Sequence, residues 1–296
     1  MSGMTLGAKF NLTLVGVFAL GFVAVAYVVR GQLDEHARSV SLEKAGLMME
    51  SALSIRKYTT DQVRPLLIKD LDTVFHPQTV PAYSAVEMFD ALRGTNPDYT
   101  YKEATLNPSN PRDRATDWEA DIVEDFRNHP EAKERVGERM GATGPSLFIA
   151  RPIKVSKPDC LQCHGEPSAL PKSVRAKYGD TQGLGWKLDE VVGAQIASVP
   201  TRVADDRAAH QFATFLGLLL AVFGTVLVVL NVLLSRMVIS PIKRMAKAAD
   251  KVSTGDMHDA EITVSGSDEI ATLGASFNRM MRSLKKAMDL IDPEDK

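Results

Sequence analysis

The sequence predicts an α+β domain between two membrane-spanning helices, followed by a helical coiled coil. Three observations predict this arrangement. Two long stretches carry no charged residue, short apolar and β-branched runs lie between them, and apolar residues at heptad spacing follow the second stretch. A chain of 296 residues, 45% hydrophobic and 24% charged, is long enough for two or three folded units.

The two uncharged stretches run from Phe10 to Val29 and from Phe212 to Leu234. Each is long enough to cross a hydrocarbon core of about 30 Å. The first is poorly followed by an Ala-x-Ala-like site, which favours an uncleaved anchor over a signal peptide. We therefore expect an N-terminal tail over 1–9, a first span over 10–30 and a second span over 212–235.

Two spans place residues 31–211 on one side of the membrane and both ends on the other. The basic residues that flank the spans are divided almost evenly, with a slight excess beside the two ends, so they favour a cytoplasmic C-terminus only weakly. The net charge is -2 and basic residues are interspersed with acidic ones. This composition gives no indication of nucleic-acid binding.

Both cysteines of the chain lie in the stretch PDCLQCHGEPSAL, where His164 directly follows Cys163. A thioredoxin-like pair needs its first cysteine at the start of a helix, whereas Pro158 and Pro167 favour a loop here. Structural zinc needs four ligands, normally from two such clusters, and the chain has one. A disulfide between Cys160 and Cys163 would be strained and would close almost no chain.

Haem attachment uses all three residues at once. In a Cys-x-x-Cys-His motif the two thiols form thioethers with the haem and the histidine binds the iron. The sequence therefore predicts one covalently bound haem c per chain, attached at Cys160 and Cys163 with His164 as the proximal metal ligand. Covalent haem attachment in bacteria takes place outside the cytoplasmic membrane, so residues 31–211 are expected in the periplasm.

The outer segment begins with apolar residues at helical spacing over 33–60, so the first span is expected to continue as a long helix until Pro65. Strand-like runs follow over 99–106, 146–155 and 191–199, with a helical pattern over 117–128. Turn-rich stretches such as NPSNP separate them. A small antiparallel sheet with flanking helices is the simplest arrangement.

Four segments resemble a family of periplasmic sensor domains that bind a single haem: SIRKYTTDQVRPLL, YKEATLNPSNPRDRATDWE, FIARPIKVSKPDCLQCHGEPSAL and GLGWKLDEVVGAQIASVP. The resemblance covers about residues 35–203 and implies a PAS-like fold with the haem held against the sheet. Arg56, Tyr58 and Arg151 match positions in these motifs. They are candidates for contact with the haem propionates or the haem edge, and ordinary surface salt bridges would suit them equally well.

The ligand on the other side of the iron is harder to predict. A member of this family places a cysteine of the long N-terminal helix opposite the proximal histidine, but this chain has no cysteine besides Cys160 and Cys163. Met48 or Met49 of the same helix are our candidates for this metal ligand. The alternatives are an open position or a histidine.

Residues 236–290 resemble a HAMP domain, in which a proline after a membrane span, two amphipathic helices and an apolar connector form a dimeric bundle. The matching features are Pro241, connector residues Ile262 and Val264, the pair Asp268-Glu269, and a heptad seam of Ile270, Leu273, Phe277, Met280, Leu284, Ala287 and Ile291. The resemblance implies a homodimer and, because only a short tail over 291–296 follows, a separate cytoplasmic signalling partner. A coiled coil that only dimerises the chain is the alternative.

These features together predict a homodimeric sensor of the bacterial inner (cytoplasmic) membrane. It would detect redox state or a small haem ligand in the periplasm and relay the signal through the HAMP region. The alternative is a membrane-anchored cytochrome c that exchanges electrons with a redox partner. An enzyme is not expected, since the outer segment has no Ser-His-Asp order, phosphate loop or distinctive carboxylate pair.

Overall fold

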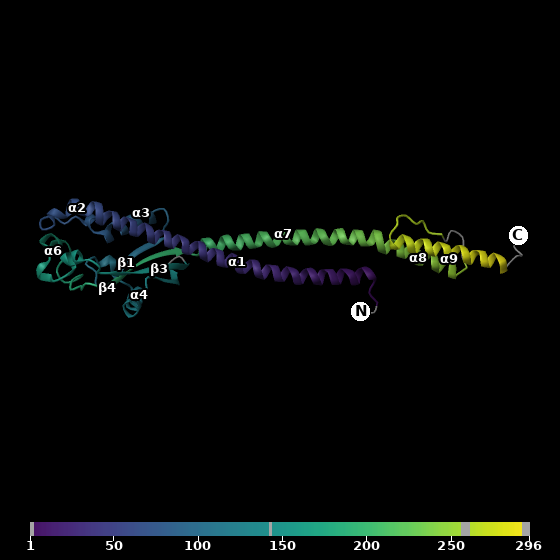
Figure 1. The fold of residues 1–296 in the computed structure, drawn as a ribbon, viewed down its shortest axis with the longest axis horizontal. Helices are drawn as coiled ribbons and strands as arrows, with labels where there is room; N and C mark the ends of the chain where they lie inside the picture. Colours follow the sequence, from purple (N-terminus) through teal and green to yellow (C-terminus); the bar gives the residue numbers. More distant parts are fainter. Residues whose placement is uncertain (1–2, 142–143, 256–260, 292–296) are drawn as a thin grey trace. The chain divides into compact units, whose positions relative to one another are not determined.

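The computed structural model describes residues 3–141, 144–255 and 261–291. It contains two compact units, one over Arg30–Phe212 and one formed by the two apolar segments together with the C-terminal helices. Figure 1 shows a small sheet with flanking helices in the first unit and helices alone in the second. The predicted α+β class is confirmed.

The first helix, α1 (Leu6–Tyr58), contains the first apolar stretch and continues into the first unit, as predicted. It does not end at Pro65. A π-helical turn, η1 (Thr59–Val63), leads into a further helical turn, α2 (Arg64–Leu67), which contains this proline. Proline lacks an N–H and its ring clashes with the carbonyl four residues earlier, so a wider turn before it lets the helix continue.

The sheet has four antiparallel strands in the order β1-β4-β3-β2. They are β1 (Thr100–Thr105), β2 (Arg135–Gly141), β3 (Gly144–Lys154) and β4 (Val191–Pro200). Strands β1, β3 and β4 fall where the sequence predicts them. The edge strand β2 and the helix α3 (Pro81–Arg93) were not predicted.

Helices cover both faces of this sheet. On one face α1 and α3 enclose a core that includes Met49, Phe89 and Ile149. On the other face lies α4 (Asp117–Asn128), whose Phe126 packs with other buried apolar side chains. Neighbouring residues of a strand point to opposite faces, so we call these the α1 face and the α4 face.

Short helices make up most of the remaining connections in this unit. They are η2 (Ile68–Asp70), η3 (Pro77–Thr79), η4 (Pro111–Asp113), η5 (Pro158–Cys160), α5 (Leu161–His164), η6 (Pro167–Ala169) and α6 (Lys172–Tyr178). The last four lie in the long connection from β3 to β4. That connection carries both cysteines.

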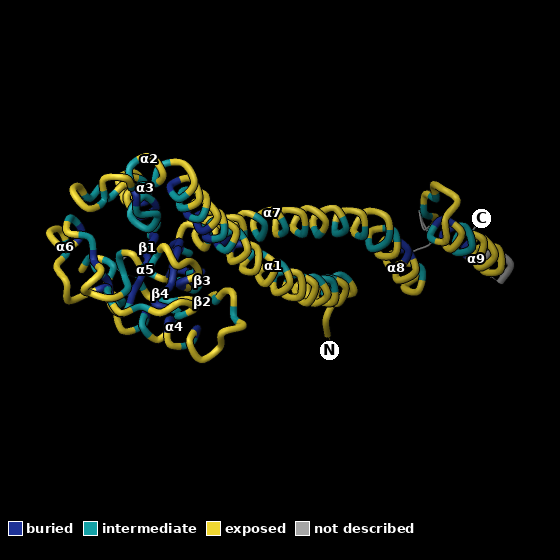
Figure 2. Tube along the Cα trace, turned by 60° about the vertical axis from the view of Figure 1, so that its left-hand side comes forward, coloured by how far each residue is buried: buried dark blue, intermediate teal, exposed yellow. Residues whose placement is uncertain are grey.

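The second apolar stretch lies in α7 (Arg202–Leu234). It and the first stretch are long and apolar enough to cross a membrane, and none of the most apolar part of either is buried within the protein. Figure 2 shows this exposure as yellow along α7 and the N-terminal part of α1. Phe18 stacks on Phe223 with ring centroids 4.9 Å apart.

The HAMP-like region consists of α8 (Ser240–Ser253) and α9 (Glu269–Ile291), preceded by a second π-helical turn, η7 (Ser235–Ile239). Its connector is held by Asn278, whose side-chain amide donates to the carbonyl of Ile262 at 2.8 Å and accepts from its N–H at 3.1 Å. Leu273, Met280 and Leu284 of the predicted seam are exposed. Residues 292–296 of the predicted tail lie outside the described residues.

Candidate functional site

The Cys-x-x-Cys-His motif folds into one helical turn. Cys160 ends η5, and α5 follows with Cys163 and His164. Both cysteines are free thiols and partly exposed. Burial raises the pKa of the Cys163 thiol, against an opposing effect of the positive charge of Arg64. Spacing of three residues within a helical turn puts the two thiols on one side of it.

The imidazole of His164 is held in a defined orientation. Its Nδ1 lies 2.7 Å from the carbonyl oxygen of Gly183, and its ring stacks on Trp186 with centroids 3.9 Å apart and planes 9° apart. A carbonyl only accepts hydrogen bonds, so Nδ1 carries the proton and Nε2 keeps a lone pair. Burial lowers the pKa of this imidazole, which favours its neutral form. This is the state in which histidine binds a metal.

A loop that is distant in the sequence holds Gly183 in place. Its N–H donates to Asn107 Oδ1 at 3.2 Å, and its φ of +74° is one that residues other than glycine rarely adopt. A Cβ at this position would lie 2.6 Å from the backbone nitrogen of Ser109. The NPSNP loop therefore determines where the acceptor for His164 lies, and it requires glycine there.

The α1 face carries a buried polar network beside this motif. Arg56 forms an ion pair with Glu103, which is 3% exposed. The hydroxyl of Tyr101 donates to Glu103 at 3.0 Å and accepts from Gln195 at 3.1 Å. Burial and the Glu103 carboxylate raise the pKa of Tyr101. Arg56 lies close enough to Cys160 for their charges to interact.

Among the described residues, the partners of His164 do not include the other candidate residues. Arg151 pairs with Glu50 at 2.7 Å and Glu134 at 2.9 Å, and Tyr58 is 60% exposed. Met48 and Met49 are buried in the core of the α1 face.

Arg64 lies close enough to Cys163 and His164 for its positive charge to lower the pKa of both groups. Its guanidinium lies 3.5 Å from the side chain of Gln162. A rise of about 1.5 Å per residue puts Met49 roughly 20 Å from Arg64 along the helix. The contacts of the described residues therefore give no support to Met48 or Met49 as the second ligand, which stays a prediction.

Arg64, Gly183 and Trp186 were missed by the sequence analysis as site residues. A signal was available, because all three lie in the segments SIRKYTTDQVRPLL and GLGWKLDEVVGAQIASVP that carry the family resemblance. What the sequence did not reveal is that these segments meet at α5. The two free thiols and the adjacent imidazole, whose Nε2 makes no hydrogen bond to another described residue, fit the donor set that covalent haem needs.

Comparisons with known proteins identify the outer unit. A family model described as Tll0287-like matches residues 34–200, more than half of the chain. The chain belongs to the Tll0287-like family. A HAMP domain model matches residues 233–286. Both resemblances predicted from the sequence are confirmed.

Two individual proteins are also similar to this Tll0287-like chain. The crystal structure of the cyanobacterial heme-protein Tll0287 aligns with 54% of this chain and 94% of its own, at 16% identity and a TM-score of 0.43. A probable methyl-accepting chemotaxis protein of Bacillus thuringiensis subsp. konkukian is 33% identical over 110 residues. That match covers 36% of this chain and 16% of the relative, so the chain spans about one sixth of it.

Proposed function

We propose that this protein is a membrane-bound haem sensor of the bacterial inner membrane. In this proposal one haem per chain is attached covalently to Cys160 and Cys163, with His164 as an iron ligand. The observation that carries it is the hydrogen bond from His164 Nδ1 to Gly183, which leaves the lone pair on Nε2 of a histidine that shares a helical turn with two free thiols. The relative Tll0287, described as a heme-protein, supports the same cofactor. Bound haem would supply an iron that changes oxidation state or takes up a small ligand.

The residues of the chain would orient this iron ligand. The carbonyl of Gly183 accepts a hydrogen bond from Nδ1 and so makes Nε2 a stronger metal ligand, while Trp186 fixes the plane of the ring. Arg64 and Arg56 add positive charge near the attachment site. This charge suits the negatively charged propionates of a haem. Arg56 would share its charge with Glu103.

We further propose that the outer unit lies in the periplasm and that α1 and α7 connect it through the membrane to the HAMP domain. The exposed residues Leu273, Met280 and Leu284 lie at heptad spacing, and such a seam is stable only against other helices. A second copy of the chain would supply them and form a homodimeric bundle. The HAMP domain would then pass the signal to a cytoplasmic signalling partner.

Haem attachment is tested first. The full-length protein is expressed with the cytochrome c maturation system, denatured, and examined for haem that stays bound to the chain. We expect covalent haem in the wild type, loss of it in the double variant Cys160→Ala/Cys163→Ala, and unchanged attachment in His129→Ala, whose histidine pairs with Asp125. A wild-type chain without covalent haem would overturn the proposal.

The role of Gly183 is tested with the visible spectrum of the haem-bound protein. Gly183→Ala is expected to keep covalent haem and to change the spectrum of the iron, because the acceptor of the His164 proton moves. Gly179→Ala is the matched control, since Gly179 also has a positive φ but no atom lies within 4 Å of a Cβ there. A spectrum of Gly183→Ala identical to the wild type would exclude this positioning role.

The second ligand of the haem iron is tested with two methionine variants and with carbon monoxide. Met48→Leu and Met49→Leu keep the volume of the buried core, which Met→Ala would not. A spectral change in one of them would identify a methionine ligand and require α1 to leave its present packing. Rapid carbon monoxide binding by the wild type would instead indicate an open position, which favours ligand sensing.

A distance measurement in the HAMP domain distinguishes sensing from electron transfer. A spin label at Leu284→Cys reports the distance between the two copies of α9 in the homodimer. A sensor is expected to change this distance by about 1–2 Å between oxidised and reduced protein, or on ligand binding. An unchanged distance, together with fast reversible electron exchange, would favour the electron carrier instead.

A further inference from the structure

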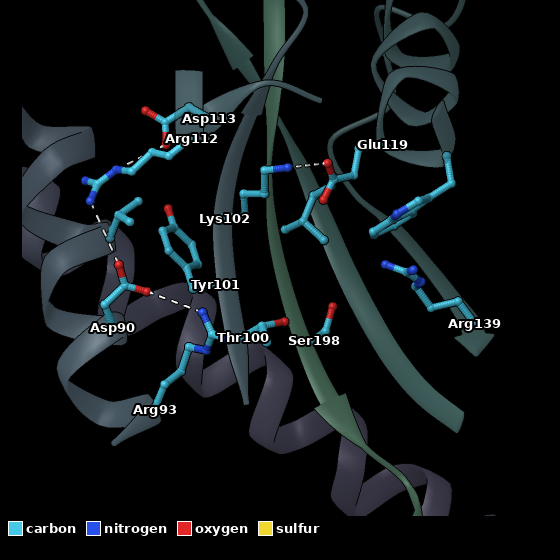
Figure 3. A pocket seen from close by; sticks show the side chains of 13 residues that line it. Asp90, Arg93, Thr100, Tyr101, Lys102, Arg112, Asp113, Glu119, Arg139 and Ser198 are labelled. Atoms are coloured by element: carbon cyan, nitrogen blue, oxygen red, sulfur yellow. Dashed lines mark hydrogen bonds and ion pairs between the residues drawn. The ribbon is translucent and has the colours of Figure 1, made fainter. Parts of the chain in front are cut away.

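A hollow of about 320 Å³ lies at the edge strand β1, and the haem proposal uses none of the residues that line its α4 side. Strand β1 pairs only with β4 in the sheet, so the hollow extends around its free edge. On the α4 face its lining includes the ion pair Lys102–Glu119 together with Thr100, Ser198, Ile196, Trp118 and Arg139. Figure 3 shows the labelled side chains from close by.

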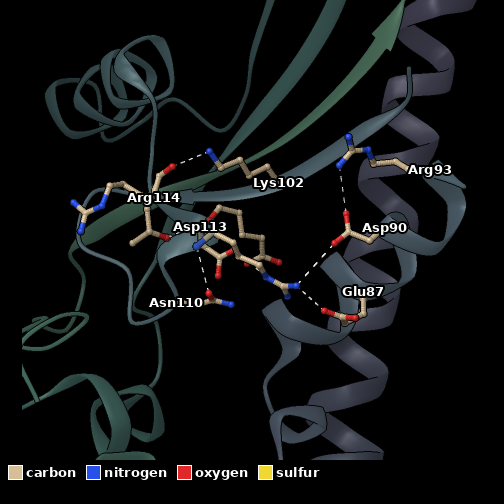
Figure 4. Close-up of polar contacts among 10 residues, drawn as sticks. Glu87, Asp90, Arg93, Lys102, Asn110, Asp113 and Arg114 are labelled. Carbon is tan, nitrogen blue, oxygen red and sulfur yellow. Dashed lines mark hydrogen bonds and ion pairs between the residues drawn. The ribbon is translucent and has the colours of Figure 1, made fainter. Parts of the chain in front are cut away.

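Four cationic side chains line this hollow, and within the described residues three of them have carboxylate partners. The three ion pairs are Lys102–Glu119 at 2.6 Å, Arg93–Asp90 at 3.6 Å and Arg112–Glu87 at 2.6 Å. Figure 4 shows the pair of Arg93 with Asp90 at the α3 side of the hollow, and Figure 3 labels Arg112. Arg139 has no carboxylate partner in the described part of the chain. The lining therefore contains one positive charge, that of Arg139, without a carboxylate partner among the described residues.

Arg139 is held by stacking rather than by an ion pair. Its guanidinium carbon lies 3.8 Å from the centroid of the Trp118 ring. Stacking covers one face of the guanidinium and leaves the N–H groups at its edge available. Trp118 itself packs on Phe148, with ring centroids 5.4 Å apart. The plane of the guanidinium is therefore fixed by aromatic packing before any ligand binds.

Two hydroxyl groups lie across from this guanidinium. Thr100 and Ser198 are direct cross-strand partners, and neither hydroxyl has a side-chain hydrogen bond to another described residue. Figure 3 shows these hydroxyls and the guanidinium of Arg139 turned toward the same space. Ile196 contributes an apolar surface beside them. Beside the Lys102–Glu119 ion pair, the α4 side thus combines one cation that has no carboxylate partner among the described residues, two hydroxyl donors and an apolar wall.

We propose that this hollow binds a short-chain organic monocarboxylate, with Arg139 as its charged contact. The planar fork of an arginine matches a carboxylate with two parallel hydrogen bonds. Thr100 and Ser198 would donate to the same carboxylate, and the short tail would lie on Ile196. A dicarboxylate is disfavoured, since the carboxylates of Asp90, Asp113 and Glu119 surround the rest of the hollow and repel a second negative charge.

The test uses the full-length protein in a neutral detergent and isothermal titration calorimetry. Butyrate is the probe, and butyramide is its uncharged counterpart of the same size. We expect butyrate to bind at one site per chain and butyramide to bind at least about tenfold more weakly, since a hydrogen bond to a charged group is lost. Equal binding of the two probes, or no binding of butyrate, would overturn the proposal.

Three variants assign the binding to this hollow. Arg139→Gln is expected to weaken butyrate binding at least about tenfold, and Ser198→Ala about threefold. Arg93→Gln removes a cation that lines the same hollow but already pairs with Asp90, so it is expected to change binding by less than about twofold. Each variant must keep the wild-type circular dichroism spectrum. Wild-type affinity in Arg139→Gln would exclude this site.

Discussion

The two faces of the sheet each carry a buried carboxylate, one in strand β1 and one next to it, and each is neutralised in a different way. On the α1 face Glu103 pairs with Arg56, 47 residues away in the sequence. On the α4 face Glu119 pairs with Lys102, 17 residues away, and also accepts from the N–H of Thr116 in the capping box of α4. The first pair joins the long helix α1 to the sheet, whereas the second mainly secures the start of a local helix.

This difference predicts unequal effects when each carboxylate is removed. Glu103→Ala is expected to lower the free energy of unfolding by about 3–5 kcal/mol, because Arg56 stays largely buried without its partner. The measurement is denaturant unfolding of the detergent-solubilised chain, followed by circular dichroism. The control is Glu134→Ala. Glu134 pairs with Arg151 and is more exposed than Glu103, so its removal should change the free energy of unfolding by less than about 1 kcal/mol.

Glu119→Ala is expected to have a smaller effect, about 2 kcal/mol, from the lost helix cap and ion pair. Lys102 keeps one partner in this variant, since its Nζ also donates to the carbonyl of Arg114 at 2.8 Å. The same unfolding measurement applies. If Glu119→Ala destabilised the protein as much as Glu103→Ala, the proposed difference between the two faces would not hold.

Tyr101→Phe is expected to lower the free energy of unfolding by about 1 kcal/mol at neutral pH, because the hydroxyl between Glu103 and Gln195 is lost. Burial raises the pKa of Tyr101 in the folded chain. The stability linked to this group is therefore present below the unfolded pKa of about 10 and is lost as the pH rises above it. Unfolding measured from neutral to alkaline pH should show a steeper loss in the wild type than in Tyr101→Phe.

Asp113→Asn is expected to have a small effect of the opposite sign. Asp113 lies where the two faces meet, near the charges of Glu103 and Lys102, and burial raises its pKa to about 6. The contribution of Asp113 to the free energy of unfolding is present below the ordinary pKa of 3.8 and is lost as the pH rises through about 6. The asparagine variant should be about 1 kcal/mol more stable than the wild type at pH 7 and equal to it near pH 4. A less stable variant at pH 7 would contradict this.

The elements that the sequence predicted have strong local patterns. Strands β1, β3 and β4 are apolar or β-branched runs, and α4 begins with a capping box. Strand β2 lacks such a pattern, because Gly137 and Arg139 occupy the side that faces α4, and it forms through pairing with β3. Gly137 is needed there, since a Cβ would lie 2.6 Å from the ring of Phe148. Helix α3 could have been found, because Ala85, Val86 and Phe89 share one buried side.

The sequence by itself determined the chemistry of the candidate haem site. Cys160, Cys163 and His164 lie within one helical turn, so their mutual placement depends only on local geometry. Tertiary structure alone decided which groups act on them. The carbonyl that orients His164 comes from a residue 19 positions away, and the partner of Arg56 comes from a strand 47 positions away.

The same distinction applies to Arg139. A sequence shows a positive charge, but whether that charge is paired depends on which carboxylates packing brings within about 4 Å. Three of the four cations at the hollow receive a partner from another element or turn, and within the described residues Arg139 receives an aromatic ring instead. Local spacing sets which groups are available, and the packing of distant segments sets which of them are left to bind something else.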